Sequence, residues 1–170
     1  LNDTLPDAPF TLGVVLWQTG RPVEAAAAFR RAIAIRPDYD EAQYMLGTVL
    51  RQLGDADAAL AAIREAIRLR PASAESHLSL GQLLQQRGDR VGAAAAFDEA
   101  KRLNQKKADV QASTFAVGVG RKRLKDGDLT GAIDEFQRAI ALASDNFEAH
   151  YELAKAFTAA KRLTDARAHL

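Results

Sequence analysis

Residues 46–71 have the sequence LGTVLRQLGDADAALAAIREAIRLRP, in which two apolar runs are separated by Gly54 and Asp55 and followed by Pro71. Within residues 41–53 and 56–69 the apolar side chains recur three and four residues apart. This spacing places them on one face of a helix. Glycine adopts the left-handed backbone of a tight turn at little cost, and proline cannot continue a helix. The stretch therefore predicts two antiparallel helices joined by a short turn.

The same hairpin recurs along the chain. Three residue types return every 34 residues, namely Leu12, Leu46 and Leu80, then Gly13, Gly47 and Gly81, then Ala25, Ala59 and Ala93. After a step of 39 residues the pattern resumes at Gly120 and runs on for another 34. A period of this length indicates stacked hairpins, because one hairpin cannot bury its apolar face alone. The predicted repeats are residues 6–39, 40–73, 74–107, 113–146 and 147–170, the last of which ends within its second helix.

This pattern resembles the tetratricopeptide repeat (TPR), a 34-residue unit with Leu-Gly in the first helix, Gly at the turn, Ala–aromatic–Ala in the second helix and Pro at the end. Residues 12–37, LGVVLWQTGRPVEAAAAFRRAIAIRP, and residues 46–71 carry nearly all of this code. The resemblance covers essentially the whole chain, although Gln105 and Ser144 replace the terminal proline. It implies an all-α fold, a single array over residues 1–170 that forms a right-handed superhelical solenoid of about four and a half antiparallel helix pairs.

The resemblance also implies a function, because the first helices of such arrays line a concave groove that holds an extended peptide or short helix. We therefore expect a protein–protein interaction scaffold with a protein or peptide partner of unknown identity. The family's groove positions, carried onto this sequence, give the candidate binding residues Phe10, Val14, Trp17, Tyr44, Thr48, Arg51, Gln52, Ser79, Gln82, Gln86, Arg121, Lys125, Tyr151 and Lys155.

The candidate groove changes in character along its length. Its first residues are aromatic and apolar, its middle is rich in amides, and its last part offers Arg121, Lys125 and Lys155. A partner with an apolar anchor followed by carboxylates would match this order. Trp17 and Tyr44 have a second interpretation as ordinary packing between repeats. The clamp that binds chaperone tails in some members of the family needs Lys and Asn where Phe10 and Val14 stand, so a co-chaperone role is not expected.

The composition is that of a soluble globular protein, with 48% apolar residues, 26% charged residues and a net charge of +1. No apolar run is long enough to insert in a membrane. The sequence does not determine the cellular compartment, although we favour the cytoplasm over the periplasm. The helices are rich in Ala and Arg, which gives the chain a bacterial character. The basic run at residues 121–125 is spread around a helix and followed by Asp126 and Asp128, so we interpret it as a solvated face and expect no nucleic acid.

We expect no enzyme activity and no cofactor or metal. The chain has no cysteine, and no candidate nucleophile is paired with a base. His77 and His150 occupy the same position in different repeats, His169 is terminal, and we interpret all three as structural. Gly120 is the packing glycine of the fourth repeat, whereas Gly118 faces the candidate groove.

Two alternatives to a free-standing scaffold stay open, a scaffold arm of a larger enzyme such as a glycosyltransferase and a self-assembly module. Because Leu170 falls within a helix, we expect the natural protein to continue past it, and open terminal repeats would allow a homodimer. The extra residues near 105–112 have two interpretations, an insertion tolerated in a surface connection or a local change of curvature. We also expect the first helix of the fourth repeat to begin early, because no proline precedes it.

Overall fold

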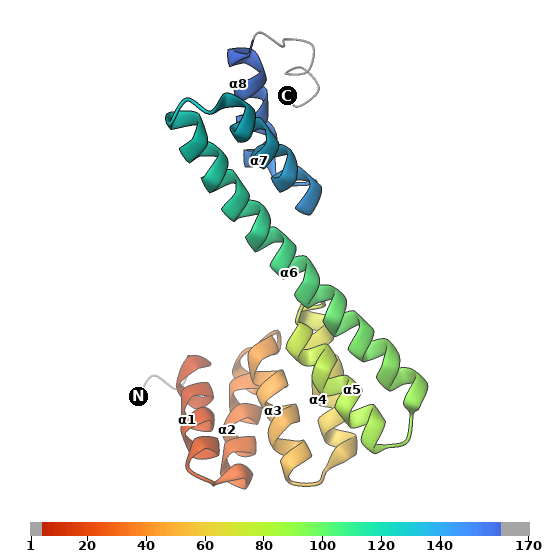
Figure 1. Ribbon diagram of the computed structural model, residues 1–170. Coiled ribbons are helices and arrows are strands. Elements are labelled where there is room, and N and C mark those ends of the chain that lie inside the picture. Colours follow the sequence, from red (N-terminus) through yellow and green to blue (C-terminus); the bar gives the residue numbers. More distant parts are fainter. Residues whose placement is uncertain (1–4, 161–170) are drawn as a thin grey trace. The chain divides into compact units, whose positions relative to one another are not determined.

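The structure, a computed structural model, describes residues 5–160 (Figure 1). Over this range the chain is all-α, which confirms the predicted fold class, and its helices pack pairwise in sequence order. The helices are α1 (Asp7–Gln18), α2 (Pro22–Ile35), α3 (Asp40–Gln52), α4 (Ala56–Leu69), α5 (Ala74–Gln86), α6 (Arg90–Lys125), α7 (Leu129–Leu142) and α8 (Phe147–Ala159). They make about four repeats. Leu170, His169 and the second helix expected for the fifth repeat lie outside the described residues.

The turns of the hairpins depend on glycine and on an acidic helix cap. Gly54 and Gly127 both have φ of +82°, in the left-handed region that side chains with a Cβ disfavour. Asp55 and Asp128 then cap the following helices, since each carboxylate accepts a hydrogen bond from the backbone N–H three residues later, at 3.1 Å and 2.9 Å. Such caps satisfy backbone donors that have no partner within the helix. The turns therefore form where the repeat pattern predicts them.

Each hairpin closes by placing a glycine of its first helix against a large apolar side chain of its second. A Cβ built on Gly47 would lie 2.7 Å from Cγ1 of Ile63, which leaves no room for any side chain there. The same contact recurs between the glycines and rings of the other hairpins, Gly13 with Phe29, Gly81 with Phe97, and Gly120 with Phe136. The small and large residues of the sequence pattern thus fix how closely the two helices approach.

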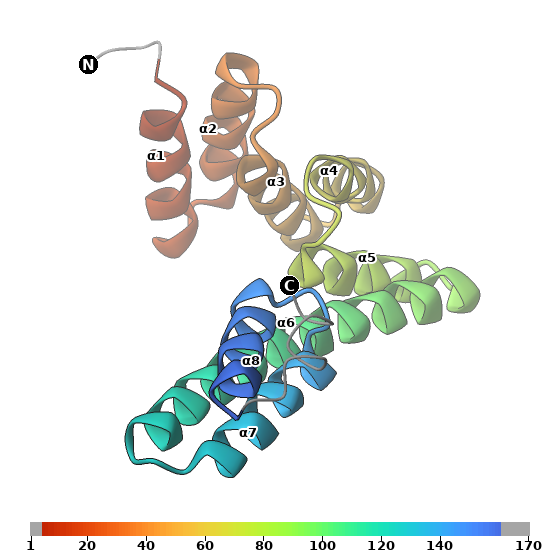
Figure 2. The same ribbon diagram turned by 90° about the horizontal axis from the view of Figure 1, so that it is seen from above.

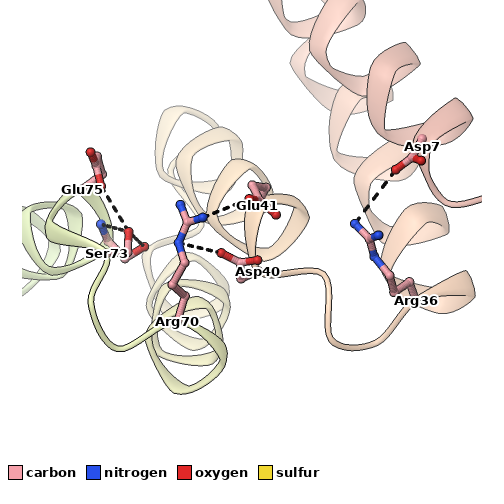
Figure 3. Close-up of polar contacts among 8 residues, drawn as sticks. Asp7, Arg36, Asp40, Glu41, Arg70, Ser73 and Glu75 are labelled. Carbon is pink, nitrogen blue, oxygen red and sulfur yellow. Dashed lines mark hydrogen bonds and ion pairs between the residues drawn. The ribbon is translucent and has the colours of Figure 1, made fainter. Parts of the chain in front are cut away.

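Within each of the first two hairpins, an arginine that follows the second helix contacts acidic residues at the start of the first helix (Figure 3). The Arg70 guanidinium, just after α4, lies 3.0 Å from both Asp40 and Glu41 in the first turn of α3. Arg36 takes the same place after α2 and lies 4.0 Å from Asp7 in α1. Acids at a helix N-terminus and a cation beyond a C-terminus also match the helix dipoles. The third hairpin has no such arginine, because position 104 is Asn.

Packing divides the chain into two compact units, residues 1–103 and residues 104–170. The first unit contains α1 to α5 and the N-terminal part of α6 (Figure 2). Its core includes Phe29, Leu50, Ile63 and Leu83. The second contains the C-terminal part of α6 with α7 and α8, and its core includes Val117, Phe136, Leu153 and Phe157. The single array expected over residues 1–170 stays a prediction.

Helix α6 differs from the expectation for the extra residues near 105–112. They form no surface connection, because α6 continues through them and is 36 residues long. The second helix of the third repeat and the first helix of the fourth are therefore one helix. The reason is local, since residues 104–112, NQKKADVQA, contain neither glycine nor proline and consist mostly of good helix formers. No described helix is both long and apolar enough to cross a membrane.

Candidate functional site

The first helices of the three N-terminal hairpins, α1, α3 and α5, lie in a row, with α3 in contact with both of the others. Side-chain hydrogen bonds link them. Trp17 Nε1 in α1 donates to Gln52 Oε1 in α3 at 2.8 Å, and Arg51 in α3 donates to Gln82 Oε1 in α5. These two bonds bring together four of the predicted binding residues, Trp17, Arg51, Gln52 and Gln82. We call the first-helix surface these four residues together with the predicted residues at the other groove positions of α1, α3 and α5, namely Val14, Tyr44, Thr48, Ser79 and Gln86.

Phe10 belongs to the packing of the first unit. Its ring lies 5.7 Å from the ring of Phe29 and 4.9 Å from that of Tyr39, measured between centroids. Trp17 and Tyr44 are half-buried and pack against the core of the first unit. These two residues therefore combine the packing and the surface roles that the sequence left open, whereas Phe10 mainly packs.

The middle of the first-helix surface is polar. Thr48 donates its hydroxyl hydrogen to the Tyr44 carbonyl at 3.0 Å, which satisfies it within α3. Ser79 is buried, and Gln82 is half-buried beside Arg51. Gln86 is exposed, and the structure shows no partner for its amide among residues 5–160. Gln86 is therefore the amide of this surface that is most available to a partner.

The basic residues predicted in the second unit are mostly paired with acids. The Arg121 guanidinium on α6 lies 2.7 Å from Glu148 and 2.9 Å from Glu152, both on α8. Lys155 Nζ lies 2.9 Å from Glu152 and 5.2 Å from the centre of the Tyr151 ring. Two cations therefore meet two carboxylates here, and a partner carboxylate would have to displace one of them. Lys125 is exposed at the end of α6.

The surroundings of Glu152 favour its ionised form on balance. Burial alone raises the pKa of Glu152, whose side chain is only 6% exposed, but the hydrogen bonds from Lys155 and Arg121 and their charges together lower the pKa below its usual value. The hydrogen bond to Glu152 raises the pKa of Arg121 in turn. Glu152 is therefore ionised at neutral pH and holds α8 to α6.

Glu148 and Glu152 occupy groove positions of the same family register, although the candidate binding residues do not include them. A signal for them exists in the sequence, because Arg121 and Glu152 are 31 residues apart, as are Arg51 and Gln82. This separation is three residues, or about one helical turn, shorter than the 34-residue repeat. It places the two side chains opposite each other on the first helices of neighbouring repeats.

A shallow hollow of about 420 Å³ lies along α8. Its lining residues are Tyr151, Ala154, Lys155, Thr158 and Ala159. The Tyr151 side chain is 57% exposed beside it. Two predicted binding residues, Tyr151 and Lys155, thus share a mostly apolar surface of the second unit.

The histidines stabilise the turns before first helices. His77 Nε2 lies 3.0 Å from the Pro71 carbonyl oxygen, and His150 Nε2 lies 3.0 Å from the Ser144 carbonyl oxygen. In both cases the bond spans six residues, which fits their equivalent positions in the repeat. Among the residues that the structure describes, no group of three or more His, Asp or Glu side chains is arranged to hold a metal ion.

Comparison with known proteins places the repeats in one family. Profiles described as "Tetratricopeptide repeat" match residues 16–63 and 44–108, and a profile described as "TPR repeat" matches residues 120–159. No curated protein sequence matches the chain.

Solved structures with a similar fold come from several bacteria. MamA from Desulfovibrio magneticus RS-1 has a TM-score of 0.57 at 17% identity, over 99% of this chain and 92% of that chain. TTC0263, a thermophilic TPR protein of Thermus thermophilus, has a TM-score of 0.54 at 23% identity, over 96% and 87%. PilF of Pseudomonas aeruginosa has a TM-score of 0.54 at 21% identity, over 96% and 72%. At these identities the likeness concerns the fold.

Proposed function

The chain is a tetratricopeptide repeat protein, and because this family typically serves protein–protein interaction without catalysis, we propose that it binds an extended segment of a partner protein along the first-helix surface. The proposal concerns the first unit, whose first helices α1, α3 and α5 lie side by side.

The observation that carries the proposal is the combination of half-buried aromatic rings with glutamine amides on this surface. Trp17 and Tyr44 are held by the core on one side and offer rigid apolar area on the other. Such residues contribute strongly to binding because little conformational entropy is lost when they are covered. They suit an apolar side chain of the partner.

The amides suit the backbone of an extended segment. Gln52 and Gln86 are exposed at equivalent positions, 34 residues apart, on α3 and α5. Each amide carries both donors and an acceptor, as does each peptide group of the partner. Recognition would then combine one apolar anchor with backbone hydrogen bonds. Carboxylates of the partner are a weaker requirement than the sequence suggested, because Arg121 and Lys155 are already paired.

A displayed library of random peptides, selected on the immobilised chain, tests this function. We expect selected peptides to share an apolar residue. We also expect Gln86→Ala to weaken binding of the best peptide about threefold to tenfold, which corresponds to one lost hydrogen bond. Gln137→Ala is the matched control, because Gln137 is an exposed glutamine on the second helix α7. Equal losses in the two variants, or no selected peptide, would contradict the proposal.

A further inference from the structure

Helix α1 leaves an apolar face uncovered in the first unit. This face, which we call the Leu12 face, consists of Leu5, two residues before α1, and of Ala8, Leu12 and Val15 on one side of the helix. Ala8 is exposed, and each of the three larger side chains is about half exposed. One repeat later the same four positions are all buried, and their residues are Tyr39, Ala42, Leu46 and Val49. The Leu12 face therefore lacks the neighbour that covers these positions in the next repeat.

The N-terminal part of α6, which belongs to the first unit, leaves a second face uncovered. We call Ala94, Phe97 and Lys101 the Phe97 face. Ala94 and Lys101 are exposed, and Phe97 is half-buried. One repeat earlier, in α4, the first two of these positions are buried and the third is half-buried, and their residues are Leu60, Ile63 and Ile67. Each position of the Phe97 face is thus more exposed than its counterpart in α4.

The joints between repeats of the first unit show what covers such faces. The second helix of one repeat packs against the first helix of the next between α2 and α3 and between α4 and α5. Ile33 of α2, for example, packs against a cluster that includes Tyr39 and Ala42. A joint therefore brings the positions of the Phe97 face against those of the Leu12 face. The first unit carries the two halves of one further joint, and both halves are open.

We propose that the first units of two copies of this chain form this joint, with the Leu12 face of one copy against the Phe97 face of the next. The contact is head-to-tail, so each copy keeps one open face and further copies can add. Pairing of two Leu12 faces would instead place two first-helix faces together and leave both Phe97 faces open. The contact uses faces outside the first-helix surface, so it goes beyond the proposed function. Because the Phe97 face belongs to the third repeat, the contact also differs from a homodimer through terminal repeats.

The apolar packing at this contact follows from the joint between α4 and α5. Leu12 and Val15 correspond to Leu80 and Leu83 of α5, which belong to the same core cluster as Ile63 of α4. In the assembly they would cover the exposed part of the Phe97 ring, which stands where Ile63 does. Burial of these apolar side chains is the main driving force that we infer for the contact.

The charged position of the Phe97 face also fits a second copy. Lys101 corresponds to Ile33, so its apolar stem would lie against Leu5 and Ala8 and its ammonium group would stay near water. The first turn of α1 carries Asp7, whose side chain is 73% exposed. Opposite charges therefore lie at the same edge of the contact, which favours docking in this orientation.

An amide pair would link the first helices across the contact. Within the first unit, Trp17 donates a hydrogen bond to Gln52, which lies one position further on in the next repeat. The equivalent residues across the contact are Gln85 of one copy and Gln18 of the next, and both are exposed. Each amide offers donors and an acceptor, so the two can bond in the same way. The row of α1, α3 and α5 would then continue into α1 of the next copy.

Analytical ultracentrifugation of the full chain over a wide concentration range tests the assembly. We expect the mean mass of wild type to rise with concentration. Leu12→Glu and Ala94→Glu should each weaken the association by about tenfold or more, because each buries a carboxylate in the contact, with unchanged far-UV circular dichroism. Val23→Glu is the matched control, since Val23 is an apolar residue of the first unit that stays 68% exposed beside a formed joint, and it should associate like wild type. A monomeric wild type would overturn the proposal, as would association that Leu12→Glu leaves intact.

Mixing the two variants tests the head-to-tail geometry. Leu12→Glu keeps an intact Phe97 face, and Ala94→Glu keeps an intact Leu12 face. An equimolar mixture should therefore form a dimer and nothing larger, although each variant alone is monomeric. A mixture that stays monomeric would show that the two faces do not meet. A loss of monomer stability in Ala94→Glu would show instead that the same chain covers the Phe97 face, and this too contradicts the proposal.

Cross-linking tests the register, and the absence of native cysteine makes the reaction specific. Gln18→Cys mixed with Gln85→Cys should give a covalent dimer with a short bismaleimide, because the two thiols would face each other across the contact. Each variant alone should give little, since equivalent residues of successive copies lie a whole unit apart. Equal yields from Gln18→Cys alone and from the mixture would indicate that two Leu12 faces pair, and would overturn the proposed register.

Discussion

Gly120 of α6 packs against a ring that is completely buried. A Cβ built on it would lie 2.6 Å from Cε1 of Phe136, closer than side chains tolerate. Gly118, two residues earlier in the same helix, would meet nothing within 4 Å. Each glycine therefore destabilises the helix by the same loss of conformational entropy on folding. Only Gly120 makes a packing contact that offsets this cost.

We expect alanine to have opposite effects at these two positions. Gly120→Ala should lower the free energy of unfolding by about 1–3 kcal/mol, because its methyl group displaces the Phe136 ring. Gly118→Ala should raise it by about 0.5–1 kcal/mol through helix propensity. Urea unfolding followed by circular dichroism measures both. A gain of stability in Gly120→Ala would contradict the packing role, and a loss in Gly118→Ala would show that the open space there is needed.

The repeat register predicted one of these roles and left the other open. Gly120 shares its position with Gly13, Gly47 and Gly81, so the sequence alone assigned it to packing. Gly118 corresponds to Thr11, Met45 and Ser79, and no pattern speaks for glycine there. In the same way, the register placed Trp17 and Gln52 on first helices. Their mutual hydrogen bond depends on side-chain rotamers, which a repeat pattern does not contain.

At the scale of elements, Glu152 joins α8 to α6 through Arg121 and also bonds Lys155 on its own helix. Because its pKa is lowered in the folded chain, its ionised form contributes stability above the unfolded pKa of glutamate. That contribution is lost as the pH falls through the lower folded value. We expect the thermal midpoint of the second unit, measured by circular dichroism, to decrease as the pH is lowered through this acidic range.

Replacing Glu152 separates this contribution from general acid denaturation. Glu152→Gln should lower the midpoint at neutral pH, since Arg121 and Lys155 lose a charged partner in a largely buried place. Its midpoint should then depend less on pH than that of wild type. Asp134→Asn, which changes an exposed carboxylate of α7, serves as the control. The assignment fails if the thermal midpoint of Glu152→Gln falls with decreasing pH as steeply as the midpoints of wild type and Asp134→Asn.

The element that the sequence described least well is α6. A 34-residue period predicts a break after every second helix, and Pro37 and Pro71 follow α2 and α4 as expected. The third repeat has Gln105 at that position, and the following residues favour a helix. The sequence therefore held the signal for continuity, but the repeat analogy outweighed it. Local propensity decided this connection because the extra residues removed the constraint of the regular spacing.

At the scale of the whole molecule, the two units have buried cores with no residue in common. The only tryptophan of the chain, Trp17, belongs to the first unit, where it is half-buried. Its fluorescence therefore reports on that unit alone, whereas far-UV circular dichroism reports on the helices of both. This separation makes it possible to observe the two units independently in the intact chain.

We expect the two units to unfold as separate cooperative steps, because each cooperative step follows one core. Phe136→Ala empties a fully buried position of the second unit and should cost about 3–5 kcal/mol there. It should move the circular dichroism transition of urea unfolding and leave the Trp17 fluorescence midpoint unchanged. Ile63→Ala, in the core of the first unit, should instead move the fluorescence midpoint. If Phe136→Ala moved both midpoints equally, α6 would couple the cores strongly enough to make one folding unit, and the single array predicted from the repeat would be the better description of the chain.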